Sequence, residues 1–196
     1  MPHPINRRKA LAYFGLGLTA TSIVAALKGC TQAKRNPNPS PTMTAKSALN
    51  KKALPEFIGV QEWLNSSPLT IANLSGNVVL IQIWTFACIN CQRTLPYVVK
   101  WHEQYAKQGL KVVGIHTPEF PFERDINQIK SALSKHQITY PIAVDNQHKM
   151  WSAYDNEYWP HLFLADRRGI IQYDHIGEGA YEKTEQKIRQ LLSDNY

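Results

Sequence analysis

The 196-residue sequence predicts an α/β fold with a central mixed sheet, helices on both faces and an N-terminal β extension. Two runs of almost unbroken apolar residues, 78–84 and 110–116, are typical of strands buried on both faces. Apolar residues recur at helical spacing between and after these runs, and a turn at 166–169 separates two further apolar stretches. Strands that alternate with helices indicate a largely parallel sheet.

The first half of the folded region supplies the N-terminal extension and two of these strands. Residues 54–77 contain short β-tending pieces, and a hairpin or a similar extension is expected there. A helix is expected from about residue 89 to residue 107, because its apolar side chains have helical spacing and Gly109 provides a stop signal. The strand at 110–116 follows it.

The second half completes the sheet. Its expected elements are, in chain order, a helix near 126–133, a strand at 140–144, a short helix near 150–154, strands at 161–165 and 170–176, and a closing helix at 181–192. Right-handed crossovers make the early strands parallel and place helices on both faces, and the last two strands form an antiparallel hairpin. This order of elements is thioredoxin-like.

The net charge of +7 is concentrated near the N-terminus. Residues 1–52 contain nine Lys or Arg and no Asp or Glu, whereas the other 144 residues carry 13 basic and 15 acidic side chains. A nucleic-acid-binding face requires basic residues clustered on the folded domain. The distribution of charge therefore argues against nucleic-acid binding.

Residues 1–29 have the features of an export signal. Three basic residues, 7–9, precede an uncharged and largely apolar run at 10–27. The two adjacent arginines resemble a twin-arginine signal, although Ala10 stands where a larger apolar residue is usual.

Cys30 follows this apolar run and is a candidate site of lipid attachment. Leu27, Gly29 and Cys30 fit the box of a bacterial lipoprotein, whose cysteine is acylated. Lys28 does not fit, because a small residue is expected there. An uncleaved anchor and cleavage elsewhere remain open, since 18 residues form about 27 Å of helix, close to a hydrocarbon thickness of about 30 Å. All three interpretations place the folded domain outside the cytoplasm, on the periplasmic side, and the first two tether it to the membrane.

Residues 30–52 are polar, with prolines that alternate with Asn and Ser. Such a composition cannot bury a core. We expect this segment to be a tether, followed by one thioredoxin-like domain at 53–196.

Cys88 and Cys91 form a CxxC motif just after the first buried strand, and a metal site, a structural disulfide or a redox couple would explain it. A zinc site needs four ligands, and the dispersed histidines lack the spacing of a zinc-binding helix, so no metal is predicted. A permanent disulfide across so short a loop would constrain little of the unfolded chain. The redox interpretation is the favoured one.

A redox couple at this position has a clear mechanism. Cys88 stands where a helix begins, so unpaired N–H groups and the helix dipole stabilise its thiolate. This thiolate can attack a substrate disulfide, and Cys91, one turn deeper, can then attack the mixed disulfide and release reduced substrate. Cys88 and Cys91 are therefore predicted to be catalytic, and no cofactor is expected.

The segment WTFACINC, residues 84–91, resembles the active-site segment of extracytoplasmic thioredoxin-like proteins of the TlpA/DipZ type, within the broader redoxin superfamily. The likeness covers roughly residues 54–192. Four further segments resemble the soluble C-terminal part of DipZ-type proteins: GIHTPEF (114–120), YPIAVDN (140–146), YWPHLFLADRRG (158–169) and HIGEGAYEKTE (175–185).

The resemblance implies roles for residues beyond the cysteines. Pro160 takes the place of the cis-proline that faces the CxxC motif, and with Trp159 it forms a platform for a bound peptide. Trp84 and Phe86 are expected to shape the substrate-binding surface around the sulfurs, although core packing explains aromatic residues here equally well.

The resemblance also implies a function. The chain is expected to be a thiol–disulfide oxidoreductase that reduces protein disulfides, with apocytochrome c as one client and a membrane thiol-electron transporter as its electron source. The direction of electron flow stays open. A thiol peroxidase is the first alternative, weakened because a true peroxiredoxin uses a lone peroxidatic cysteine, and a redox-inert binding module or copper chaperone is the second.

One position departs from the family pattern. Thioredoxins carry a buried Asp six residues before the first cysteine, where it helps to move the proton of the second thiol, and this chain has Gln82. Glutamine cannot act as a general base. Glu119 is the candidate for proton transfer, and a solvated or capping carboxylate explains this residue equally well.

Overall fold

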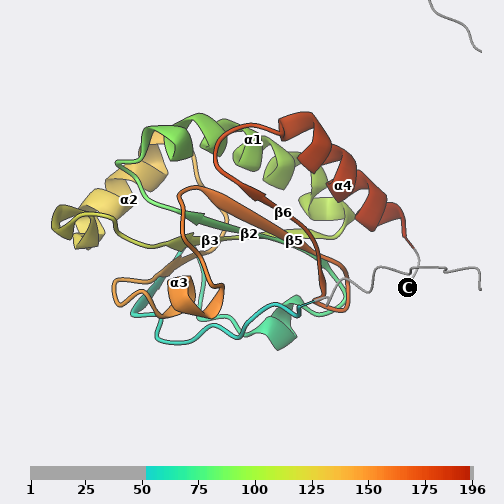
Figure 1. Cartoon of the computed structure of the whole chain (residues 1–196), viewed down its shortest axis with the longest axis horizontal. Coiled ribbons are helices and arrows are strands. Elements are labelled where there is room, and N and C mark those ends of the chain that lie inside the picture. Colours follow the sequence, from blue (N-terminus) through green and yellow to red (C-terminus); the bar gives the residue numbers. More distant parts are fainter. Residues whose placement is uncertain (1–51, 195–196) are drawn as a thin grey trace, which may run out of the picture. The chain divides into compact units, whose positions relative to one another are not determined.

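A six-stranded mixed sheet is the centre of residues 52–194, the part of the chain that the computed structural model describes (Figure 1). Its strands are β1 (Glu62–Leu64), β2 (Val78–Trp84), β3 (Leu110–His116), β4 (Ile142–Val144), β5 (His161–Ala165) and β6 (Ile171–Ile176). Their spatial order is β1-β4-β3-β2-β5-β6. β2, β3 and β4 are mutually parallel, whereas β1, β5 and β6 pair antiparallel with their neighbours.

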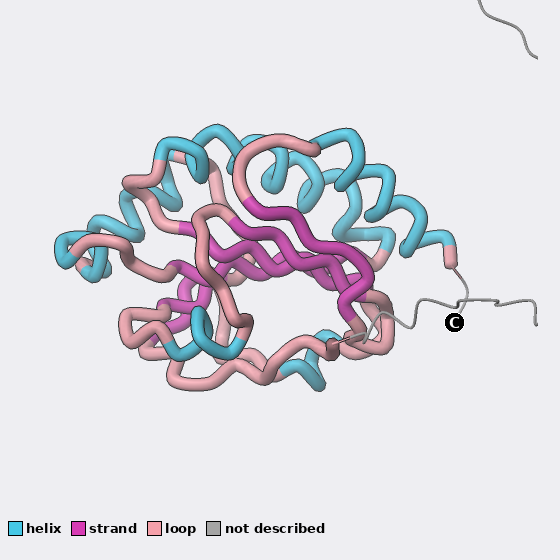
Figure 2. Tube along the Cα trace, viewed as in Figure 1, coloured by secondary structure: helices cyan, strands magenta, loops and turns pink. Residues whose placement is uncertain are grey.

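Three helices cover one face of this sheet, and a short helix lies on the other face with the segment that precedes β2 (Figures 1 and 2). The three are α1 (Ile89–Tyr105), α2 (Ile126–Lys135) and α4 (Tyr181–Ser193), and the short helix is α3 (Lys149–Ala153). Because the steps from β2 to β3 and from β3 to β4 run in the same direction across the sheet, right-handed crossovers place α1 and α2 on the same face. Single 3-10 turns form η1 (Ile71–Leu74), η2 (Ala106–Gln108) and η3 (Pro121–Arg124).

The core consists of two apolar layers separated by β2, whose seven residues are all buried. Leu80 and Trp84 pack with Leu95 of α1 in the layer beneath the long helices. Ile81 packs with Met150 of α3 in the opposite layer. Because successive side chains of a strand point to opposite faces, a strand with both faces covered is apolar at nearly every position. This explains the almost unbroken apolar run of the sequence, in which Gln82 is the one polar residue of β2.

The structure confirms most of the expected elements. The strands expected at 78–84, 110–116 and 161–165 have the same bounds. The helix expected to reach residue 107 ends at Tyr105 and continues as η2, and Gly109 follows with a φ of 100°, which a residue with a Cβ rarely adopts.

The N-terminal β extension is present, but it forms no hairpin of its own. β1 pairs with β4, about 80 residues further along the chain, with Leu64 opposite Ile142. Asn65 fixes this pairing, because its side-chain amide donates to the carbonyl oxygens of Ile138 (2.9 Å) and Tyr140 (3.1 Å). A long-range contact of this kind overrides the local hairpin pattern.

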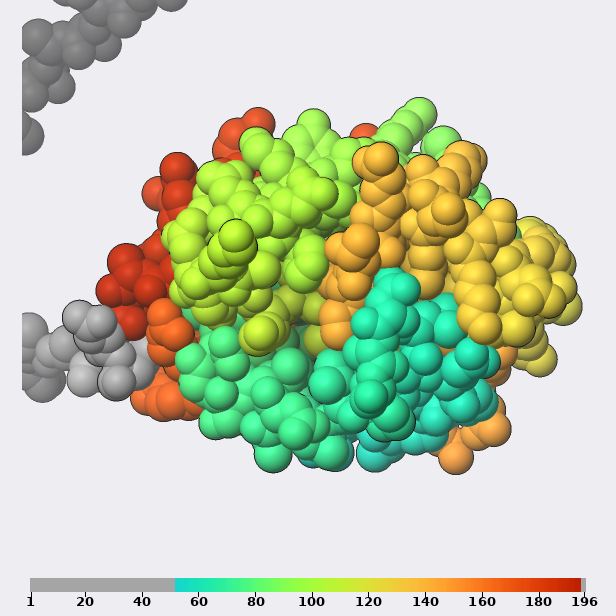
Figure 3. Space-filling model, turned by 180° about the vertical axis from the view of Figure 1, so that it is seen from behind, coloured from blue at the N-terminus to red at the C-terminus, as the bar shows by residue number. Residues whose placement is uncertain are grey.

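Seen from behind, the extension (cyan to green) covers the lower part of the domain (Figure 3). A hollow of about 230 Å³ lies where Leu69 and Leu74 meet His102, Lys111 and Pro141, and its lining contains neither cysteine. No helix among residues 52–194 combines the length and the apolar character that crossing a membrane requires.

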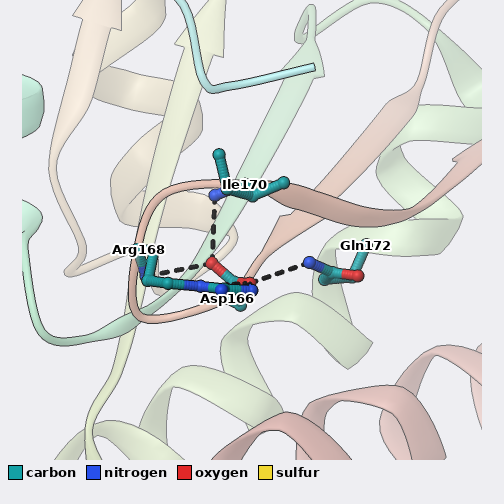
Figure 4. A network of polar contacts seen from close by, with 4 residues as sticks. All are labelled: Asp166, Arg168, Ile170 and Gln172. Atoms are coloured by element: carbon teal, nitrogen blue, oxygen red, sulfur yellow. Dashed lines mark hydrogen bonds and ion pairs between the residues drawn. The ribbon is translucent and has the colours of Figure 1, made fainter. Parts of the chain in front are cut away.

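The hairpin turn between β5 and β6 is held by the carboxylate of Asp166, which is fully buried (Figure 4). One oxygen accepts hydrogen bonds from the backbone N–H groups of Arg168 (2.9 Å) and Ile170 (3.1 Å). The other accepts from the Arg168 guanidinium (2.9 Å) and the Gln172 amide (2.8 Å). Burial raises the pKa of Asp166, but these hydrogen bonds outweigh it and hold the pKa below its usual range.

Replacing Asp166 with Asn should lower the free energy of unfolding by about 1–3 kcal/mol, because the amide NH2 then faces groups that can only donate. The lowered pKa means that the carboxylate stabilises the fold above the pKa of the unfolded chain, and that this contribution is lost as the pH falls through the folded pKa. Urea denaturation at neutral and acidic pH would measure both effects.

The matched control is Asp155→Asn, since Asp155 pairs with Lys52 on the surface and its side chain is 82% exposed. This change should alter stability by less than about 0.5 kcal/mol. Equal effects of the two substitutions, or an Asp166→Asn effect that persists in acid, would contradict the assignment.

Candidate active site

Cys88 occupies the N-cap of α1, directly after the loop that leaves the end of β2. Its sulfur accepts a hydrogen bond from the backbone N–H of Cys91 (3.4 Å). Cys88 is half-buried, whereas Cys91 is fully buried, and both are free thiols. The strand, the loop and the helix start therefore present one sulfur to solvent and hold the other beneath it.

These surroundings give the two cysteines opposite acidities. Hydrogen bonding from the Cys91 side chain lowers the pKa of Cys88 to about 6, against the opposing effect of burial, and the backbone N–H groups of Cys91 and Asn90 contribute. Burial raises the pKa of Cys91, and its hydrogen bond to Cys88 raises it further. Since a thiolate is the reactive form, this geometry makes Cys88 the nucleophile and keeps the proton on Cys91.

The loop before β5 faces the exposed sulfur. The carbonyl oxygen of Trp159 lies 3.9 Å from Sγ of Cys88, and the bond between Trp159 and Pro160 is cis, as the resemblance implies. The Trp159 indole donates to the carbonyl of Thr117 (3.0 Å) and packs on Trp151 with ring centroids 4.0 Å apart. Contacts from two other segments of the chain thus fix this loop beside Cys88.

The two aromatic residues expected at the substrate surface lie in different places. Phe86 is half-buried and stacks on His116, and it also contacts Phe122 at a centroid distance of 5.9 Å. Trp84 is fully buried, because it is the last residue of β2 and points into the layer beneath α1. Phe86 is therefore partly exposed in the loop that leads to Cys88. Trp84 is a core residue and does not contribute to the substrate-binding surface.

The acidic residue that is buried beside the cysteines is not the one expected from the sequence. Glu119 is exposed, and its negative charge opposes the lowered pKa of Cys88. The buried carboxylate is that of Glu123 in η3, which accepts a hydrogen bond from the backbone N–H of Ala87 (3.1 Å). Sequence reasoning missed Glu123 because its burial depends on donors at Thr85 and Ala87, which lie 38 and 36 positions away in the sequence.

Gln82 lies in the sheet and accepts a hydrogen bond from the hydroxyl of Tyr140 (3.1 Å), and both residues are fully buried. No group of three or more His, Cys, Asp or Glu side chains in residues 52–194 is arranged to hold a metal ion. Cys30, the predicted export signal and the predicted tether lie outside the described residues.

Comparison with known proteins places this site in a family. The model of the redoxin family matches residues 48–192. The chain is 43% identical to the protein DipZ of Mycobacterium bovis over 143 residues, which are 71% of this chain and 21% of DipZ. It therefore spans about a fifth of the length of that relative.

Two further comparisons cover nearly the whole of the other protein. The thiol-disulfide oxidoreductase YkuV of Bacillus subtilis is 28% identical over 74% of this chain and 97% of its own length. A thioredoxin-like protein solved in solution in its oxidised form has a TM-score of 0.69 and 29% identity, over 74% of this chain and 98% of that one. The chain thus belongs to the redoxin family, and its fold is thioredoxin-like.

Proposed function

We propose that this protein is an extracytoplasmic, membrane-tethered oxidoreductase that reduces protein disulfides through Cys88 and Cys91. The observation that carries the proposal is the placement of a half-buried sulfur at the N-cap of α1, hydrogen-bonded to the backbone N–H of a second, fully buried cysteine. The opposite acidities of the two thiols follow from this placement. A half-exposed thiolate next to a buried thiol is the arrangement that two-step thiol–disulfide exchange requires.

The reaction begins with the Cys88 thiolate. It attacks one sulfur of a substrate disulfide, forms a mixed disulfide and releases the other substrate sulfur as a thiolate, which takes up a proton. Cys91 then loses its proton and attacks Sγ of Cys88. The Cys88–Cys91 disulfide forms, the bond to the substrate breaks, and the electron pair and a proton go to the departing substrate sulfur.

The substrate chain would lie along the loop before β5. The carbonyl of Trp159 beside Cys88 offers a backbone acceptor to an extended peptide, in the manner of an added strand. Phe86 supplies an apolar side to the same surface. This arrangement favours cysteines in unfolded or extended segments, and apocytochrome c before haem attachment is a client of that kind.

The remaining parts of the proposal concern the membrane. The N-terminal export signal and Cys30 support delivery to the periplasmic side and tethering by a lipid or an uncleaved anchor. A reductase there needs electrons from the cytoplasm, so a membrane thiol-electron transporter would restore the dithiol.

The direction of electron flow is tested by the midpoint potential of the full chain, titrated against glutathione. We expect a value near that of thioredoxin, about −270 mV, which would suit a reductant. A value near about −120 mV would indicate an oxidant and would contradict the reducing role.

Replacing Cys91 with Ser should trap Cys88 in mixed disulfides with client proteins, because the attack that releases the substrate is removed. Non-reducing electrophoresis of the native compartment, followed by mass spectrometry, would identify the trapped species. The matched control is Cys88→Ser, which keeps the buried thiol and should trap nothing. Equal trapping by both variants would show that Cys88 is not the nucleophile. Peroxide consumption that survives Cys91→Ser would favour a peroxidase.

Alkylation of Cys88 in a Cys91→Ala variant should still occur at pH 7 and should slow as the pH falls. The hydrogen bond from the Cys91 thiol is absent there, so the half-maximal rate should occur above the wild-type value of about pH 6 and below the pKa of a free thiol, about 8.5. Iodoacetamide rates between pH 4 and 9 would show this, and a midpoint of about 8.5 or above would contradict stabilisation by the helix N-terminus.

A further inference from the structure

Glu123 is a fully buried carboxylate that joins two loops next to the cysteines. One oxygen accepts hydrogen bonds from the hydroxyl of Thr85 and from the backbone N–H of Ala87, in the segment immediately before Cys88. The other accepts from the backbone N–H groups of Glu119 (2.6 Å) and Phe120 (2.8 Å), in the loop after β3.

Capping of η3 explains only half of these contacts. The bond from the Phe120 N–H caps the start of η3, and a solvated glutamate could form it equally well. The bonds from Thr85 and Ala87 come from residues 36 and 38 positions away in the sequence, and they require the carboxylate to be buried. Burying a charge is costly unless its hydrogen-bonding capacity is filled, so this placement indicates a function at the cysteine loop.

The donors to Glu123 are all neutral groups. His116, whose Nε2 lies 3.4 Å from the Thr85 hydroxyl, is fully buried, and burial lowers its pKa to about 4 against the opposing charge of Glu123. The imidazole is therefore uncharged at neutral pH. The negative charge of Glu123 is solvated by dipoles and is not cancelled by a cation among these contacts.

We propose that Glu123 is a positioning residue for the cysteine pair: its buried carboxylate holds the segment before Cys88 against the loop after β3 and sets how readily Cys91 gives up its proton. The proposal rests on the function proposed above. Glu123 acts on the sulfurs through the Thr85–Ala87 backbone and through its charge.

The electrostatic part follows from the order of the two steps. In the dithiol, burial, the hydrogen bond and charge of Cys88, and the charge of Glu123 all raise the pKa of Cys91. Once Cys88 enters a mixed disulfide, its charge is gone, and burial and Glu123 remain. The charge of Glu123 then adds to burial in disfavouring loss of the Cys91 proton to the departing substrate sulfur, which is the step that ends the mixed disulfide.

The test compares Glu123→Gln with Glu119→Gln in the full chain. Ionisation of Cys91 is followed by the ultraviolet absorbance of its thiolate in the Cys88→Ser background, because the buried sulfur is closed to alkylating reagents and no Cys88 charge contributes there. Glu123→Gln should lower the midpoint by about one pH unit, a tenfold change in the ionisation constant, because a like charge no longer disfavours the thiolate. Glu119→Gln should leave this midpoint unchanged. In the chain that keeps Cys88 it should lower the midpoint of Cys88 instead, because the charge of Glu119 acts on Cys88.

A second variant, Glu123→Asp, keeps the charge but shortens the side chain. It should leave the Cys91 midpoint close to that of the wild type and slow the attack of Cys88 on a model disulfide at least threefold, because the carboxylate no longer reaches both loops. If Glu123→Gln does not fold, the rate of Cys88 attack in Glu123→Asp tests the positioning role on its own. An unchanged Cys91 midpoint in a folded Glu123→Gln variant, or an unchanged Cys88 rate in Glu123→Asp, would overturn the proposal. These readouts need no client protein, so they stand apart from the trapping experiment, whose failure would refute the oxidoreductase assignment itself.

Discussion

The placement of the Cys88 sulfur at the start of α1, where the thiol and the backbone N–H of Cys91 both donate to it, is the constraint on which the chemistry of this protein depends. The bond from the backbone N–H exists because Cys88 takes the N-cap position, where a helix has N–H groups without intrahelical partners. A serine or aspartate usually fills this position with an oxygen, and here a sulfur fills it. The cap thus serves two purposes, since it starts the helix and stabilises a thiolate.

The rest of the fold keeps that cap in place. β2 lies at the middle of the sheet with neighbours on both sides, so the point at which the chain leaves it is fixed by two ladders of backbone hydrogen bonds. α1 is anchored in turn by buried side chains such as Leu95 and Trp101. The loop that carries Trp159 precedes β5, which pairs with the same central strand. The cysteine loop and the Trp159 loop are therefore both positioned by β2, and β2 resists a displacement of either loop relative to the other.

Local pattern was sufficient to predict the elements and the cysteine pair, because each depends on neighbours in the sequence. The apolar run at 78–84 indicates a strand that is buried on both faces, and the spacing of Cys88 and Cys91 indicates that they lie one helical turn apart. The pairing of β1 with β4 was beyond such reasoning, since it depends on the amide of Asn65 reaching carbonyls more than 70 residues away. The burial of Trp84 was equally hidden, because an aromatic residue at a strand end suits a core and a surface alike.

The position of the buried carboxylate of Glu123 is explained by where the backbone of a sheet has free hydrogen-bond donors. At Gln82, in the middle of β2, the backbone N–H groups are used by the neighbouring strands, and the side chain receives a bond from the hydroxyl of Tyr140. A carboxylate there would be buried with few donors, which is unfavourable. Beyond the ends of β2 and β3 the backbone has left the ladder, and three N–H groups and a hydroxyl converge on Glu123. An uncharged amide therefore suits the middle of β2. A glutamate beyond the strand ends can be buried beside the cysteines because its carboxylate is fully hydrogen-bonded there.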